Sequence, residues 1–215
     1  MSFLLYGIIN EASSLAIEPT FTLIKSAELA AVAKACENEV SREPALVLAY
    51  GEKVMNIHQQ TTLIPMRYGS ILADEETIKV HLQDNQSRYQ ARLVELNNCE
   101  EMGVRLLLEP FSDSDTSPQQ PVSGLSYLQA RKRAYAIPEQ AEQQAVFLED
   151  VLSGLYRQHC AAISVFNGQQ TYLLSYLVPR SNLPAFRERL NSVVKSITNL
   201  GSISGPWPPY NFANN

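Results

Sequence analysis

Residues 161–178 read AAISVFNGQQTYLLSYLV, and this stretch decides the fold. Two apolar runs, 161–166 and 171–178, flank the dipeptide Asn167-Gly168. This dipeptide favours a two-residue hairpin turn, because both of its residues tolerate a positive φ. We therefore expect two antiparallel strands joined by a tight turn, with the first strand buried.

The elements on either side of this hairpin complete a recognisable order. Upstream, residues 102–108 predict a strand and residues 124–136 predict a helix. After Pro138 the helix restarts, as an apolar stripe at three- and four-residue steps indicates. Downstream, Ser181 or Asn182 is expected to cap another helix, and residues 200–203 predict a closing strand. The order strand, helix, strand, strand, helix, strand is that of the ferredoxin-like or split βαβ motif.

The first hundred residues predict a second set of strands and helices, whose topology the sequence does not order. Short apolar runs predict strands at 3–9, 21–24 and 61–64. The alanine content of residues 27–36 (AELAAVAKAC) favours a helix, although the period there does not decide. Further helices are predicted over 43–57 and, capped by Asp74, along a long apolar stripe that skips one turn near residue 85.

We expect an α+β protein of two domains. The polar stretch 112–123 (SDSDTSPQQPVS) resembles a linker, but it falls inside the strand–helix order that begins at residue 102, so we interpret it as a surface loop. The predicted domains are an N-terminal α+β domain, 1–98, and a C-terminal ferredoxin-like domain, 99–215. A tail rich in proline and aromatic residues starts at about residue 205.

Composition and charge exclude several classes of protein. The 215 residues are 45% hydrophobic and 18% charged, which is typical of a globular chain, and the formal charge of −5 argues against nucleic acid as a ligand. No apolar run approaches the roughly 20 residues that span a bilayer, and the N-terminus lacks a signal-peptide pattern. Three widely spaced cysteines fit reduced thiols in a cytoplasmic protein.

No catalytic, cofactor-binding or metal-ligating residues are predicted. The three histidines have no partners at metal-ligand spacing, and we expect solvated or capping imidazoles at His58, His81 and His159. Glu100, Glu101 and Glu109 flank the strand predicted at 102–108, where paired acids can perform general acid–base chemistry. The sequence shows no cleft there, so we expect these carboxylates to be exposed at the edge or ends of the strand.

The segment 65–69 (PMRYG) has a composition that core packing does not explain. Pro65 ends a strand and Gly69 permits a bend, so Arg67 sits on a rigid turn beside Tyr68. The guanidinium either presents its planar fork of donors to a partner or forms an internal ion pair with Glu75 or Glu101. The internal pair is the favoured interpretation.

The tail 205–212 (GPWPPYNF) is the second such segment. Its three prolines in four residues favour a polyproline-like backbone, which spaces three rings at rigid intervals. Trp207, Tyr210 and Phe212 either pack onto the protein's own sheet, which is the default, or anchor another chain.

The chain resembles the gas vesicle protein F/L family. The resemblance rests on four segments in the family's order: 5–9 (LYGII), 64–70 (IPMRYGS), 124–128 (GLSYL) and 205–212 (GPWPPYNF). It implies a non-enzymatic role in building gas vesicles, the protein shells that give aquatic microbes buoyancy, and two α+β domains with ferredoxin-like character. It supplies no catalytic residues and no cofactor.

The resemblance also implies partners and a location. The expected partners are the main gas vesicle shell protein and other gas vesicle proteins, with no nucleic acid and no lipid membrane. The expected location is the shell within the cytoplasm, with the gas-facing side as one candidate position. The expected partner-binding residues are Arg67, Tyr68, Trp207, Tyr210 and Phe212.

Two alternatives stay open at this point. A ferredoxin-like domain could be an RNA-binding module if its strands exposed rings; the candidate strand residues are Val165 and, as the rings, Phe166, Tyr172 and Tyr176. It could equally be a small-molecule-sensing regulator, since a fold does not choose a function.

Overall fold

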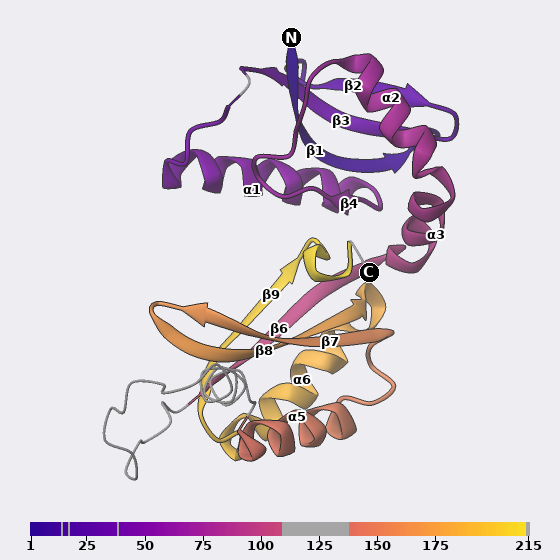
Figure 1. The fold of residues 1–215 in the computed structure, drawn as a ribbon. Helices are drawn as coiled ribbons and strands as arrows, with labels where there is room; N and C mark the ends of the chain where they lie inside the picture. The colour runs from indigo at the N-terminus through magenta and orange to yellow at the C-terminus, as the bar shows by residue number, and fades with distance from the viewer. Residues whose placement is uncertain (14, 17, 38, 109–137, 214–215) are drawn as a thin grey trace, which may run out of the picture. The chain divides into compact units, whose positions relative to one another are not determined.

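A computed structural model describes residues 1–13, 15–16, 18–37, 39–108 and 138–213, which form two compact units (Figure 1). The first unit comprises Met1–Glu101 together with Gly205–Asn215, and the second comprises Met102–Ser204. Each unit has its own β-sheet with accompanying helices, so the predicted α+β class is confirmed. The sequence assigns the tail to the C-terminal domain, whereas in the structure the tail packs with the first unit.

A five-stranded sheet forms the centre of the first unit. Strand β1 (Ser2–Asn10) pairs antiparallel with β3 (Leu29–Cys36), and β3 pairs antiparallel with β2 (Thr22–Ser26). Two short strands, β4 (Ile64–Pro65) and β5 (Ile71–Leu72), both pair antiparallel with β1. The strands predicted near residues 3–9 and 21–24 are therefore present, whereas the strand predicted at 61–64 is only the two-residue β4, which begins at Ile64.

The helix favoured for residues 27–36 is wrong, because these residues contain the strand β3. This strand lies between β1 and β2, and its residues from Leu29 to Ala33 are completely buried. Small side chains let other elements approach such an interior strand closely, and that packing outweighs the intrinsic helix propensity of alanine.

Three helices accompany this sheet, and their ends follow local sequence signals. Helix α1 (Pro44–Gln60) has its proline in the first turn, where the missing N–H costs no hydrogen bond. Helix α2 (Glu75–Asp84) is capped by Asp74, whose Oδ1 accepts the Thr77 N–H at 2.7 Å. Helix α3 (Gln86–Leu96) starts directly after Asn85, and this break between α2 and α3 lies where the predicted apolar stripe skips one turn.

The second unit contains a four-stranded sheet in the order β7-β8-β6-β9. The strands are β6 (Cys99–Leu107), β7 (Gln158–Phe166), β8 (Gln169–Pro179) and β9 (Leu200–Trp207). The first and third strands along the chain are interior and the second and fourth are at the edges, which agrees with the expected βαββαβ motif. Asn167 and Gly168 link β7 and β8 with φ values of 50° and 79°, as the hairpin predicts.

Helices α5 (Glu139–Val151) and α6 (Leu183–Val193) supply the rest of this unit's core. The apolar stripes predicted for them are buried against β6 and β8, through Ala145, Leu148, Phe186 and Leu190. Asn182 is at the N-cap position of α6, but its side chain donates to the Leu155 carbonyl instead of capping the helix. The predicted loop 112–123 and helix 124–136 lie outside the described residues, as does Glu109.

Two predictions about exposure and backbone are wrong in this part of the chain. Strand β7 is not buried, because it is an edge strand and most of its side chains are exposed or half-exposed. The tail is not polyproline-like, because β9 continues through Trp207 and the short 3₁₀ turn η3 (Tyr210–Phe212) follows. Among the described residues, no helix is both long and apolar enough to cross a membrane.

Candidate functional site

The turn 65–70 is fixed at both of its ends by the first sheet. The chain leaves the sheet at Pro65 and returns at Ile71, and the strands on either side both pair with β1. Between them, Gly69 adopts a φ of 89°, a region that glycine enters without strain, and the Ser70 N–H donates to the Arg67 carbonyl at 3.1 Å. The turn therefore presents Arg67 and Tyr68 from a rigid backbone.

Tyr50 of helix α1 stabilises this turn through its hydroxyl group. Its buried hydroxyl lies 2.7 Å from the carbonyl oxygens of both Leu5 and Met66, and it donates its single proton to one of them at a time. Burial raises the pKa of Tyr50 well above its ordinary value, so the phenol stays protonated and remains a donor. One side chain thus connects α1, β1 and the turn.

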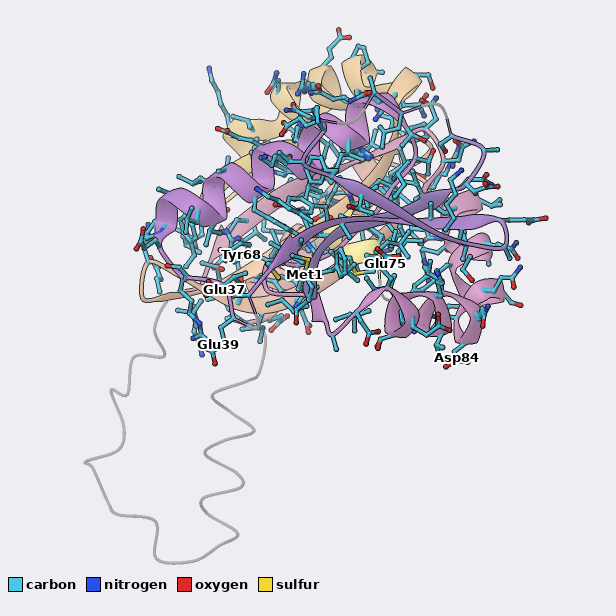
Figure 2. All side chains as sticks on the ribbon, turned by 90° about the horizontal axis from the view of Figure 1, so that it is seen from above. Met1, Glu37, Glu39, Tyr68, Glu75 and Asp84 are labelled. Carbon is cyan, nitrogen blue, oxygen red and sulfur yellow. The ribbon has the colours of Figure 1, made fainter. Side chains whose placement is uncertain are left out.

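Tyr68, labelled in Figure 2, is half-buried and packs against residues of its own unit. Its ring meets the ring of Tyr50 edge-on, with 5.1 Å between centroids, and its hydroxyl donates to the Ser41 carbonyl at 2.7 Å. Tyr6 stacks on the other side of Tyr50 at 4.5 Å. These three rings form a continuous aromatic column beside the turn.

An apolar pocket of about 290 Å³ lies beside this column. Its apolar wall includes Leu4, Tyr6, Leu46, Ala49, Tyr50 and Tyr68. The adjacent first turns of α1 are exposed throughout, and Leu46 and Leu48 leave 46% and 69% of their surface uncovered, with Val47 exposed between them. In Figure 1 these turns extend past the strands of the sheet. The result is a contiguous aliphatic surface at the rim of an apolar pocket.

A second pocket of the first unit, about 340 Å³, receives Arg67. It is lined by the turn, by β5, by His81 of α2, by Arg88 and Tyr89 of α3, and by Tyr210 of the tail. The predicted ion pair of Arg67 with Glu75 or Glu101 is wrong: the exposed guanidinium forms no ion pair within the described chain. The carboxylate of Glu101 is instead engaged by the tail.

Arg88, Tyr89 and His81 form a small network at this pocket. The His81 Nε2 lies 2.8 Å from the Tyr89 hydroxyl, which also receives a long, 3.4 Å hydrogen bond from Arg88. The Arg88 guanidinium lies 5.0 Å over the Tyr89 ring. Burial, with the nearby Arg88 charge, lowers the pKa of His81 below its ordinary value, so at neutral pH the imidazole is uncharged. His81 is thus half-buried and hydrogen-bonded rather than solvated.

The tail is held by Glu101 at the start of β6. One carboxylate oxygen accepts the Asn211 backbone N–H at 2.9 Å, and the other accepts the Asn211 side-chain amide. Phe212 is only 1% exposed and Tyr210 is half-buried, with its pKa raised to about 12 by burial, whereas Trp207 keeps 50% of its surface exposed. Two of the three predicted anchor rings therefore pack onto the protein's own first unit.

The expected exposure of Glu100, Glu101 and His58 is wrong. Both carboxylates are buried, and Glu100 Oε2 lies 2.9 Å from Nε2 of His58, a buried residue in the last turn of α1. The partners are distant in sequence, by 42 residues for His58 and by 110 for Asn211, so no local pattern signals them.

Of the three rings that the RNA-binding alternative names, the structure exposes only Phe166. Tyr172 and Tyr176 face the core, where Tyr176 packs against Phe186 at 5.6 Å. Phe166 is exposed and lies 4.7 Å beneath the Arg105 guanidinium. Within the described ranges, no three His, Cys, Asp or Glu side chains are grouped as a metal site would require. His159 contacts Glu149 at 3.2 Å.

The structure brings together only some of the predicted contact residues. Arg67 and Tyr210 line one pocket although 143 residues separate them, and Tyr68 lines the neighbouring apolar pocket. Sequence reasoning missed Arg88 and the aliphatic surface of α1. The sequence does indicate the aliphatic surface of α1, because three consecutive apolar residues, 46–48, cannot all face the core from one helix.

The fold and these pockets define a two-unit α+β protein whose first unit presents a cationic and an apolar pocket, both lined in part by one rigid turn. A sequence model described as "Gas vesicle synthesis protein GvpL/GvpF" matches residues 2–214, and the chain belongs to this family. The resemblance seen in the sequence is confirmed, and it makes the chain a gas vesicle protein.

Individual relatives agree with this assignment. A protein named "Gas vesicle protein L" from Streptomyces sp. (strain CB03234) is 24% identical over 168 residues, which cover 71% of this chain and 63% of the relative. The matched part of the chain thus spans less than two thirds of that relative's length. Crystal structures of GvpF from Anabaena sp. PCC7120 and from Microcystis aeruginosa match all of the chain and 96% and 99% of their own lengths, with TM-scores of 0.73 and 0.72 at 17% and 13% identity. They share its fold.

Proposed function

We propose that the protein is a non-enzymatic assembly factor or minor shell component that contacts the main gas vesicle shell protein through the apolar surface of its first unit. Family membership supports the gas vesicle as its place of action. The observation that carries the contact surface is the exposed aliphatic start of α1 beside the apolar pocket. Contiguous exposed aliphatic groups of this kind mark interaction sites on proteins.

The chemistry of this surface suits an apolar protein partner. The main shell protein expected for this family is small and hydrophobic, and such a chain must be kept from self-association until it is incorporated. Leu46, Val47 and Leu48 offer aliphatic contact area, and the pocket behind them accepts an inserted apolar side chain in the manner of a helix-in-groove complex.

The predicted contact residues take different parts in this proposal. Tyr68 forms a wall of the apolar pocket, and Trp207 adds a half-exposed ring on the same unit. Phe212 and Tyr210 act indirectly, because their burial holds the tail in place. The protein works at the shell surface inside the cell, with the gas-facing side reached only if it joins before the shell closes.

The test is co-expression with the main shell protein followed by capture on a tag carried by the full chain. The wild-type chain is expected to retain the shell protein. The double variant Leu46→Gln with Leu48→Gln is expected to lose it while its melting temperature stays unchanged, because both side chains are exposed.

The matched control is Val146→Gln in α5, which removes an equally exposed aliphatic side chain from the second unit. This variant is expected to capture the shell protein as the wild type does. Equal capture by the α1 double variant and the wild type would show that α1 is not the contact surface, and no capture by the wild type would refute the proposed function itself.

A further inference from the structure

The pocket beside Arg67 contains two guanidinium groups that form no ion pair within the described chain. Arg67 projects from the turn and Arg88 from α3, and both are exposed. Other cations of the first unit do have carboxylate partners, as in Lys25 with Glu11 at 3.0 Å and Lys53 with Glu18 at 3.0 Å. Arg42 is also exposed and forms no ion pair within the described residues, so what distinguishes Arg67 and Arg88 is that both line one pocket.

Arg92 makes the contrast sharper, because it lies one turn after Arg88 on the same helix. Its Nη1 forms an ion pair with Glu95 at 2.6 Å. No Asp or Glu is among the described residues that line the pocket, although the Asp84 carboxylate lies near enough to act on His81, in a chain whose acidic residues outnumber its basic ones by 22 to 17. The pocket is locally cationic in an acidic protein, which favours an anionic occupant.

We infer that this pocket binds a carboxylate carried by a peptide segment of a protein partner. Guanidinium groups present parallel N–H donors that match the two oxygens of a carboxylate. The Tyr210 hydroxyl and the Ser70 hydroxyl lie at the same pocket and are available as further donors, since neither hydroxyl forms a hydrogen bond within the described residues.

The walls indicate a peptide rather than a small free anion. Between the cationic groups the pocket is lined by the apolar side chains of Leu5, Pro65, Ile71 and Leu72. A volume of about 340 Å³ exceeds what a single carboxylate needs, and the apolar lining accommodates hydrophobic residues that flank the acidic one. The neutral His81 shares a hydrogen bond with the Tyr89 hydroxyl, and the two arginines are the charged groups that line the site.

The inference deepens the proposed contact with a gas vesicle protein and rests on that proposal for the partner's identity. The two surfaces are separable in experiment: the apolar contact depends on Leu46 and Leu48, whereas this pocket depends on Arg67 and Arg88. Binding of synthetic peptides tests the pocket without any gas vesicle partner. If no peptide binds, the inference about the pocket fails, and the proposed function is still decided by the co-expression experiment.

The experiment measures fluorescence anisotropy of three labelled peptides with the full chain. One alternates leucine and glutamate and is amidated at its C-terminus, the second replaces every glutamate by glutamine, and the third is the glutamine peptide with a free C-terminal carboxylate. We expect the first or third peptide to bind and the second not to bind. Which of the two binds distinguishes a side-chain from a C-terminal carboxylate.

Variants connect this binding to the pocket. Loss of a hydrogen bond to a charged group costs about 1.5–3 kcal/mol, so Arg67→Gln and Arg88→Gln should each weaken binding by about tenfold or more. The matched control Arg92→Gln removes the same charge from the same helix outside the pocket and should leave the affinity unchanged. High salt should weaken binding by the wild type.

Three results would overturn the inference. These are equal binding of the glutamate and glutamine peptides, wild-type affinity in the double variant Arg67→Gln with Arg88→Gln, and saturable binding of inorganic phosphate when neither carboxylate peptide binds. Circular dichroism of the double variant should match that of the wild type, because both side chains are exposed, so lost binding reports the pocket and not the fold.

Discussion

Replacing Phe212 by alanine should destabilise the first unit strongly although the residue lies at the end of the chain. The ring is 1% exposed, so the substitution removes a fully buried aromatic side chain. Phe→Ala in a core costs about 3–5 kcal/mol, and a segment near a terminus relaxes partly into the space, which gives the lower end, about 3 kcal/mol. For a unit of this size that corresponds to roughly a 12 °C fall in melting temperature.

The assay is thermal unfolding of the full chain followed by circular dichroism, with wild type and variant at equal concentration. Trp207→Ala is the matched control, because this ring is half-exposed and should cost less than about half as much. Phe212→Leu, which keeps most of the volume, should cost less than about 1.5 kcal/mol and guards against a variant that fails to fold.

The reasoning is refuted if Phe212→Ala shifts the midpoint by less than about 4 °C, the equivalent of roughly 1 kcal/mol. A ring reserved for another chain would cost no stability in the isolated protein. Such a result would indicate that Phe212 binds a partner and that the tail does not contribute to the first unit's core.

Three further predictions follow from buried polar groups. Glu100→Ala should lower the free energy of unfolding by about 3–5 kcal/mol in urea titrations, because it breaks the buried pair with His58, and an unchanged midpoint would contradict that pairing. Tyr50→Phe should cost about 1–3 kcal/mol by the same measurement, since it leaves the Leu5 or Met66 carbonyl without its donor; a neutral effect would show that these bonds contribute nothing. Burial lowers the pKa of His81 below 6.5. The neutral imidazole's contribution to the free energy of unfolding is therefore complete above pH 6.5 and is lost as the pH falls through the folded-state pKa. An NMR titration that gives His81 a pKa at or above 6.5 would contradict its burial.

Signals that act over a few residues were enough to predict much of the fold. The Asn167-Gly168 turn forms because both residues reach positive φ, and Asp74 caps α2 because its carboxylate meets a backbone N–H three residues ahead. The apolar stripes of α5 and α6 record which face of each helix is buried. From these elements the strand order of the second unit could be expected.

What could not be predicted depends on contacts between distant segments. Strand β3 is recognised only once its neighbours bury both of its faces, which alanine content does not reveal. The tail joins the first unit through Asn211 and Glu101, and the cationic pocket exists because Arg67 and Arg88 approach from separate elements. The residue types identify the hydrogen-bond donors and acceptors, but which donor meets which acceptor depends on the tertiary fold.

The central claim, that α1 of the first unit contacts the main shell protein, is tested most directly by photo-crosslinking in cells that build gas vesicles. A benzoylphenylalanine placed at position 48 of α1 is compared with one placed at position 146 of α5, both exposed aliphatic positions in the wild-type chain. The account predicts a covalent adduct with the main shell protein from position 48 and none from position 146. An adduct from position 146 alone, or from neither position while the protein is present on the vesicles, would contradict it.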